Sequence, residues 1–165
     1  MKLFLDTNVL IDFIMERPLF YDAAAMIVSY AFEKKVSICV STLSIVTANF
    51  ICVERCKMPM EIFRRKIDFL RAFIEVCSVD SSDIYHSYDA GWKDFEDGVQ
   101  YYSALRSVSD YLVTRNSKDF EESAIKVVST EEACTLLWLK DENFENTEDF
   151  SIRSATGICW MFFQQ

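Results

Sequence analysis

The sequence predicts an α/β protein in which helices cover both faces of a parallel sheet. Short apolar runs rich in β-branched residues alternate with longer segments whose apolar residues recur every three to four positions. A length of 165 residues and a hydrophobic content of 51% suffice for one domain with a substantial core, and no repeat or Pro/Gly-rich linker interrupts the pattern. We therefore expect a three-layer α/β/α sandwich around a parallel central sheet of about five strands.

Short apolar segments have the composition of buried strands. The first reads Lys-Leu-Phe-Leu at residues 2–5, and the others are similarly short and apolar. Each is followed by polar residues or by a helical pattern, as in a sheet built from strand–helix–strand units. In chain order, the expected strands are residues 2–5, 36–40, 76–79, 111–114 and 126–129.

Helices are expected in the longer segments between these strands. The spacing of Ala, Ile and Val in residues 20–32 is typical of a helix with one buried face. Pro59 suits the first turn of a helix, and Asp6 suits the N-cap of a helix after the first strand. The remaining expected helices are residues 43–53, 60–73, 82–88, 95–108 and 130–139.

The composition excludes several classes of function. The chain has only three Gly residues, so neither a G-x-G-x-x-G nor a Walker A phosphate loop is present. Its single His, His86, excludes His-rich zinc sites and disfavours a Ser-His-Asp triad. With 17 Lys+Arg against 26 Asp+Glu, the net charge is −9, which disfavours a protein that coats nucleic acid by charge. An enzyme that binds phosphate through a metal ion remains compatible with this charge.

Targeting and domain organisation also follow from the chain. The six Cys residues form no C-x-x-C motif, and we expect them to be free thiols. Asp6 interrupts the N-terminal apolar run too early for a signal peptide, and residues 155–163 are too few to span a bilayer. We expect a cytoplasmic protein with no membrane association. Residues 1–140 are expected to form the domain, and residues 141–165 an acidic and then apolar tail.

Polar and acidic residues recur where the expected strands end. Asp6 follows the first strand, Asn116 and Asp119 follow the fourth, and Asp94 and Asp97 begin the helix before the fourth. Each acid also suits a helix start, because Asp is a leading N-cap residue. In a parallel sheet, however, the carboxyl ends of the strands form one edge, where ligands bind. A set of oxygen ligands without His or Cys indicates Mg²⁺ or Mn²⁺.

Several blocks together resemble the PIN-domain family. They are LFLDTNVL at residues 3–10, DFED at 94–97, QYYSAL at 100–105 and YLVTRNSKDF at 111–120. The resemblance extends over roughly residues 1–139 in order and spacing. It implies strand order 3-2-1-4-5, in which the first and fourth strands are neighbours and Asp6 lies near Asp119.

The resemblance also implies functional residues. Asp6, Asp97 and Asp119 match the acids that bind the metal ion, and Thr114 and Asn116 match polar residues that hydrogen-bond around the site. The acid that the family has after the second strand falls near residues 48–49, where this chain has Asn49. The catalytic set is therefore Asp6, Asn49, Asp97, Thr114, Asn116 and Asp119, and the substrate-binding candidates are Asn8, Asp94, Arg115 and Lys118.

The function implied by the resemblance is an Mg²⁺- or Mn²⁺-dependent endoribonuclease. A metal-activated water would attack the RNA phosphodiester and leave a 3′-hydroxyl and a 5′-phosphate. Small bacterial PIN proteins are commonly the toxin half of a toxin–antitoxin pair, so the resemblance implies a small antitoxin protein as partner and a homodimer as assembly.

Other classes of protein remain open at the level of sequence. Asn49 has no negative charge, which leaves room for a catalytically weak PIN-fold binding protein. A haloacid-dehalogenase-type phosphatase requires a second Asp where this chain has Asn8. A response-regulator receiver would use Asp80 after the third strand but would leave Asp97 and Asp119 without a role.

Overall fold

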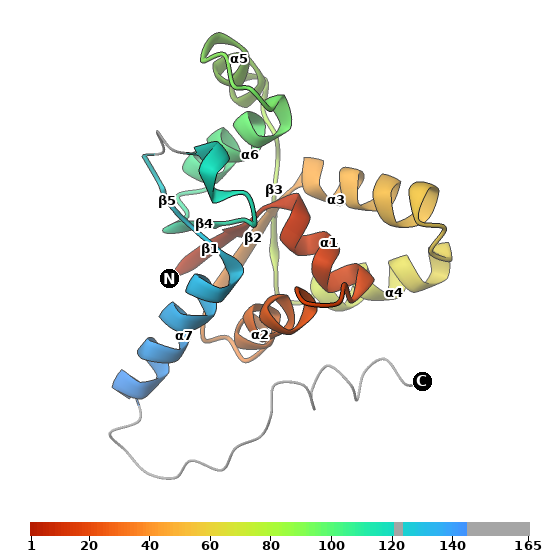
Figure 1. The fold of residues 1–165 in the computed structure, drawn as a ribbon, viewed down its shortest axis with the longest axis vertical. Helices are drawn as coiled ribbons and strands as arrows, with labels where there is room; N and C mark the ends of the chain where they lie inside the picture. Colours follow the sequence, from red (N-terminus) through yellow and green to blue (C-terminus); the bar gives the residue numbers. More distant parts are fainter. Residues whose placement is uncertain (121–123, 145–165) are drawn as a thin grey trace.

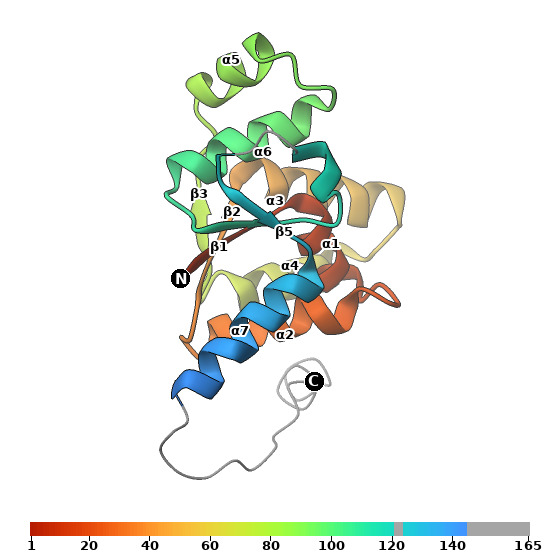
Figure 2. The same cartoon turned by 60° about the vertical axis from the view of Figure 1, so that its left-hand side comes forward.

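The structure, a computed structural model, describes residues 1–120 and 124–144, apart from the side chains of Asp119 and of residues 142–144. It contains a five-stranded parallel sheet in the order β3-β2-β1-β4-β5, between layers of helices (Figures 1 and 2). The predicted three-layer architecture and strand order are confirmed. Most of the predicted tail, residues 145–165, lies outside the described residues.

The central strand β1 determines the position of everything else in the sheet. It pairs with β2 on one side and with β4 on the other, and Phe4 lies opposite both Cys39 and Leu112. Both faces of β1 are buried, which explains its continuous apolar run. The strands are β1 (Lys2–Leu5), β2 (Ser37–Ser41), β3 (Glu75–Cys77), β4 (Tyr111–Val113) and β5 (Lys126–Val128).

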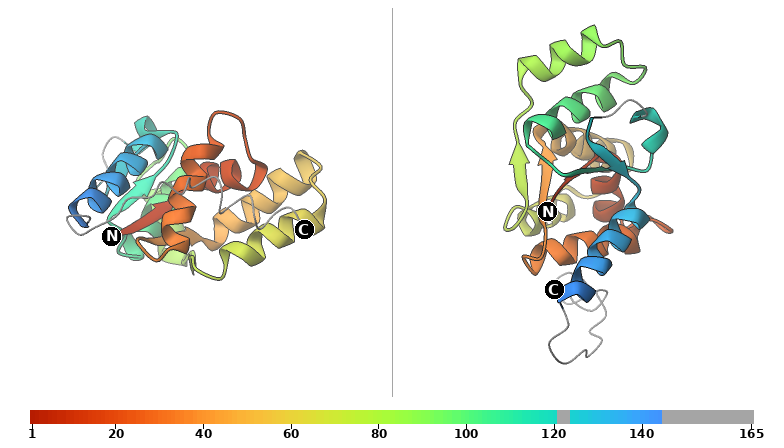
Figure 3. Two further views of the ribbon diagram at one scale, coloured as in Figure 1. Left: turned by 90° about the horizontal axis from the view of Figure 1, so that it is seen from below. Right: turned by 90° about the vertical axis from the view of Figure 1, so that its left-hand side faces the viewer.

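Alternate side chains of β1 enter two different cores. Leu3 and Leu5 pack in the larger core with helices α1, α2 and α7, whereas Phe4 packs in a smaller core with Tyr101 and Ala104 of α6. The helices are α1 (Thr7–Met15), α2 (Tyr21–Phe32), α3 (Thr42–Asn49), α4 (Met60–Leu70), α5 (Ser81–Asp89), α6 (Phe95–Arg106) and α7 (Thr130–Phe144), with short segments η1 (Phe50–Arg55) and η2 (Ser117–Phe120). Figure 3 shows α2 and α7 side by side on one face of the sheet.

Two helical segments differ from the prediction in kind. The helix expected over residues 43–53 is α-helical only to Asn49 and continues as the π-helix η1. The apolar spacing of Phe50, Ile51 and Val53 fits either helix, so periodicity does not reveal the change. After β4, the helix start expected from Asn116 and Asp119 is a 3₁₀ segment of four residues.

The described cysteines are free thiols, as expected, and three of them lie in the cores: Cys39, Cys52 and Cys77. None of the helices in residues 1–120 and 124–144 combines the length and apolar composition that a membrane span requires.

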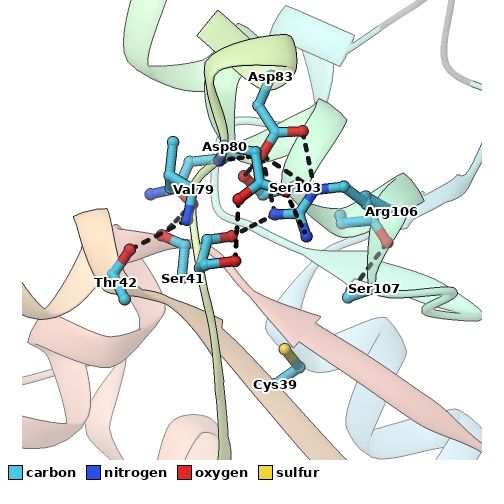
Figure 4. Close-up of polar contacts among 12 residues, drawn as sticks. Cys39, Ser41, Thr42, Val79, Asp80, Asp83, Ser103, Arg106 and Ser107 are labelled. Carbon is cyan, nitrogen blue, oxygen red and sulfur yellow. Dashed lines mark hydrogen bonds and ion pairs between the residues drawn. The ribbon is translucent and has the colours of Figure 1, made fainter.

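An ion pair fastens α5 to α6 (Figure 4). Arg106 of α6 donates to Asp83 of α5, with 2.9 Å between Nη2 and Oδ2, and also donates to the Ser78 carbonyl. Ser103 donates to the same carboxylate, which is 2% exposed. Burial acts to raise the pKa of Asp83, but the Arg106 hydrogen bonds and charge outweigh it and hold the pKa below its ordinary value.

Replacing Arg106 with Met should reduce the free energy of unfolding by about 2–3 kcal/mol, because the buried Asp83 charge would lose its partner. Urea denaturation at pH 7 measures the loss. The matched control is Arg71→Met, since the Arg71–Asp68 pair is largely exposed and should change stability by less than about 1 kcal/mol.

The pH dependence gives a second check on the Arg106 variant. A lowered folded-state pKa means that the ion pair stabilises the protein above the unfolded-state pKa of Asp83, near 3.8, and that this stabilisation disappears as pH falls through the folded-state pKa. The difference between wild type and Arg106→Met should therefore shrink below pH 4. Equal losses for Arg106→Met and Arg71→Met would contradict the assignment.

Candidate active site

The candidate site lies at the carboxyl ends of the two central strands. The chain proceeds from β1 toward β3 on one side and then crosses to β4 and β5 on the other, so the strand order reverses between β1 and β4. Asp6 follows β1 directly, and Thr114 follows β4. Helix α6 begins nearby, which brings a third part of the chain to the same edge of the sheet.

Asp6 is the most constrained acid of this site. It is 3% exposed, and its Oδ1 accepts a hydrogen bond from the Thr7 backbone N at 2.6 Å, which caps α1. Its Oδ2 accepts from the Thr114 hydroxyl at 2.7 Å and from the Asn8 amide at 2.5 Å. Both oxygens of the carboxylate are therefore fixed in position, and Asp6 serves as the N-cap of α1.

The residues after β1 and β4 interlock. The Thr114 hydroxyl accepts from the Asn8 amide at 2.9 Å and from the Asn116 backbone N at 3.1 Å. The Asn8 side-chain oxygen in turn accepts from the Arg115 backbone N at 3.3 Å. The Asp-Thr-Asn and Thr-Arg-Asn triplets thus form one hydrogen-bonded unit that orients Asp6.

The start of α6 places further acids at this edge. Asp94 is the N-cap, and its Oδ1 accepts from the backbone N of Glu96 at 2.9 Å and of Asp97 at 3.4 Å. Asp97 is 9% exposed in the first turn. The Glu96 carboxylate accepts from the Thr7 hydroxyl at 3.0 Å, which joins α6 to the residue beside Asp6. We did not single out Glu96 from the sequence, although it is an acid directly before Asp97.

A buried polar network supports these acids from behind. The Gln100 amide donates to the Thr7 hydroxyl at 2.7 Å and to the Ser44 hydroxyl at 2.8 Å. Ser41 at the end of β2 donates to the Gln100 side-chain oxygen at 2.8 Å. Gln100, Ser41 and Ser44 are fully buried, so their partners must come from within the protein. The network fixes α6 relative to α1 and α3.

The charges around Asp6 differ from those around other buried carboxylates. Asp12 contacts Arg115 at 3.1 Å and Arg17 at 3.4 Å, and Asp83 contacts Arg106. Asp6 forms no ion pair with any residue of the described part of the chain. Burial, together with the negative charge of Glu96, raises the pKa of Asp6 to about 6, against the opposing hydrogen bonds from Thr114 and Thr7 and the positive charge of Arg115.

The donor set fits a hard divalent cation in chemical kind. Asp6, Glu96 and Asp97 offer only oxygen ligands, and no described cationic side chain forms an ion pair with Asp6, although the Arg115 charge acts on it from a distance. Among the side chains that the structure describes, no three acid, His or Cys groups lie close enough together to bind a metal ion on their own. The Asp119 side chain, one of the predicted ligands, lies outside the described part, while its backbone lies in η2.

Other predicted residues are placed as follows. The Asn49 amide donates to Met60 Sδ of α4 at 3.8 Å, and no hydrogen bond within the described residues joins it to Asp6. The Arg115 guanidinium pairs with Asp12 and lies 4.5 Å from the centre of the Phe20 ring. Asn116 and Lys118 are exposed beside Thr114 in the chain.

Comparison with known proteins agrees with the fold. One chain of the crystal structure of VapBC2 from Rickettsia felis, bound to a DNA fragment from its promoter, is similar with a TM-score of 0.55 and 19% identity, covering 78% of this chain and 98% of that one. A chain of FitAB bound to the IR36 DNA fragment has a TM-score of 0.45 and 15% identity, covering 78% and 94%. No protein of curated function matches the sequence.

The family is established by sequence. The PIN-domain family model matches residues 2–118, which include both central strands, α6 and the acids that begin it. The chain therefore belongs to the PIN-domain family, as its motifs indicated.

The raised pKa of Asp6 makes a prediction for the metal-free protein. A folded-state pKa of about 6 against 3.8 in the unfolded state means that the ionised carboxylate disfavours folding, and that this penalty develops as pH rises toward 6 and is complete above it. In EDTA, the stability of Asp6→Asn relative to wild type should rise by about 1 kcal/mol between pH 5 and pH 8. Urea denaturation at the two pH values measures this difference.

A matched control for this experiment is Asp89→Asn, which neutralises an exposed acid. Its stability relative to wild type should change little between pH 5 and pH 8. A relative stability of Asp6→Asn that falls over the same interval would show that the Asp6 carboxylate is stabilised by a positive charge in the folded protein.

Proposed function

We propose that the protein is a metal-dependent endoribonuclease of PIN type that cleaves RNA at the Asp6 site. The observation behind the proposal is the buried Asp6 carboxylate, which has no ion pair within the described residues and lies near Glu96 of α6. PIN domains are generally nucleases, and the matched residues 2–118 include all of these groups. A buried carboxylate without an ion pair destabilises the fold through desolvation, and a bound cation would offset that penalty.

Each part of the site has a role in this proposal. Asp6, Asp97 and Asp119 bind the ion, and Thr114 and Asn8 hold Asp6 in the orientation for binding. Asn116 extends the same hydrogen-bonded unit through its backbone N. When bound, Mg²⁺ or Mn²⁺ lowers the pKa of a coordinated water and neutralises charge on the scissile phosphate.

Positive charge for the RNA backbone comes from residues after β4. Lys118 is exposed and forms no ion pair with other described residues, so its ammonium group is available to a phosphate. The Arg115 guanidinium is already paired with Asp12, and Asn8 and Asp94 are occupied in orienting Asp6 and capping α6. Of the four residues expected to bind substrate, we assign direct phosphate contact to Lys118.

The cleavage test uses labelled structured and unstructured RNAs with Mg²⁺ or Mn²⁺, and with EDTA as the metal-free control. Wild type should cleave only with metal, and Asp97→Asn should cleave at least about 100-fold more slowly, because loss of even an outer-shell partner costs 10–100-fold. Asp89→Asn, which neutralises an exposed acid of α5, should cleave at the wild-type rate. Cleavage that persists in Asp97→Asn would contradict the proposed site.

A catalytically weak PIN-fold binding protein is the second candidate function. It is favoured by Asn49, whose amide contacts Met60, so that no acid from this part of α3 reaches the site. The same assay distinguishes the two functions. Wild type that cleaves no RNA in either metal, while binding RNA with a measurable affinity, would favour the binding protein.

We further propose that the protein is the toxin of a toxin–antitoxin pair, that a small antitoxin protein is its partner and that it forms a homodimer. The proposal is supported by family membership and by the fold shared with a VapBC2 chain. Induced expression of wild type alone should reduce colony formation, and Asp97→Asn should not. Co-expression with a small antitoxin protein should restore growth and yield a co-purifying chain. Equal growth with wild type and Asp97→Asn would contradict the toxin role.

A further inference from the structure

Helix α3 brings polar groups, but no described acid contact, to the site. Its site-facing residue is Ser44, whose hydroxyl lies 3.1 Å from the Thr7 hydroxyl and accepts from Gln100. Asn49, one and a half turns further on, donates to Met60. Glu54 is exposed on the π-helix η1 that follows. A carboxylate that takes the place of the family's acid on α3 must therefore come from another element.

Glu96 reaches the site from α6 and is fixed at two points. Its backbone N donates to Asp94 at 2.9 Å, which sets its place in the first turn. Its side-chain Oε1 accepts from the Thr7 hydroxyl at 3.0 Å, and this hydroxyl is itself fixed by the Gln100 amide at 2.7 Å. Glu96 and Asp6 thus share Thr7, one through its side chain and the other through its backbone N.

The charge arrangement points to a cation rather than to a structural ion pair. Glu96 is half-buried, and it forms no ion pair with any residue that the structure describes. The protein compensates its other buried acids with arginine, as at Asp12 and Asp83. Two neighbouring carboxylates without a direct ion pair to arginine repel each other, and a divalent cation between them removes that repulsion.

We propose that Glu96 supplies a further carboxylate of the Asp6 metal site, in addition to Asp97 and in place of an acid on α3. This inference rests on the proposed metal-dependent function and names a ligand for that same site. Asp6, which follows β1, provides the buried ligand, and Glu96 provides a ligand from the first turn of α6. The hydrogen bond from Thr7 leaves Oε2 and a second lone pair of Oε1 available for the ion.

The experiment measures Mn²⁺ binding directly, by isothermal titration and by the loss of the free-ion paramagnetic resonance signal, without RNA. Glu96→Gln removes the charge but keeps an oxygen that can accept from Thr7, so the fold should be retained. It should weaken Mn²⁺ binding at least about tenfold relative to wild type. Thermal unfolding in EDTA checks that the variant is folded.

The matched control is Glu54→Gln, which makes the same chemical change on the segment after α3. Mn²⁺ binding by Glu54→Gln should equal that of wild type. Asn49→Ala is compared in parallel, because a role for Asn49 as ligand would be the main competing arrangement. Weaker binding in Glu54→Gln or Asn49→Ala, with wild-type binding in Glu96→Gln, would overturn the assignment of Glu96.

Failure of the inference is distinguishable from failure of the proposed function. Wild type that binds Mn²⁺ while Glu96→Gln binds equally well overturns the role of Glu96 and leaves a metal site at Asp6. Wild type that binds Mn²⁺ no better than Asp6→Asn overturns the metal site itself, and the inference with it.

Discussion

The site depends on one buried carboxylate that is shared by the two central strands. Asp6 follows β1 and caps α1, and it accepts from Thr114, which follows β4. The hydrogen bonds fix its position but do not offset its burial, so the pKa of Asp6 rises to about 6. Asp6 is buried where the strand order reverses, at the edge of the sheet where the ends of β1 and β4 lie side by side.

The polar network behind Asp6 links the fold to the chemistry. Gln100 joins α6 to Thr7 and Ser44, and Ser41 completes the connection to β2. All of these groups are buried and satisfied, so displacing one leaves its partners without hydrogen bonds. The network therefore holds α6 in a fixed position relative to the ends of β1 and β2. Precise placement of catalytic groups requires support of this kind.

The sequence predicted the sheet well and the site only in part. Strand β1 was predictable because both of its faces are buried, and Asp6 because it follows directly. The π-helix η1 was not, because apolar residues such as Phe50 and Val53 fit both helix types. The contact between the Asn49 amide and Met60 was likewise not predictable, because counting along α3 does not reveal which side chain of α4 lies beside it. Glu96 was overlooked because its contact with Thr7 spans 89 positions of sequence.

Ion pairs with arginine distinguish the buried acids that stabilise the fold from the acids of the candidate site. Asp12 and Asp83 are slightly more buried than Asp6, and each forms an ion pair with arginine in the folded protein. A chain with net charge −9 has few cations to distribute, and none of the described ones pairs with Asp6 or Glu96. If these two acids served only the fold, pairing with arginine or replacement by neutral residues would lower their cost. Their lack of a direct ion pair is explained if a cation from solution completes the site. Charge and burial lead to this conclusion independently of similarity to other proteins.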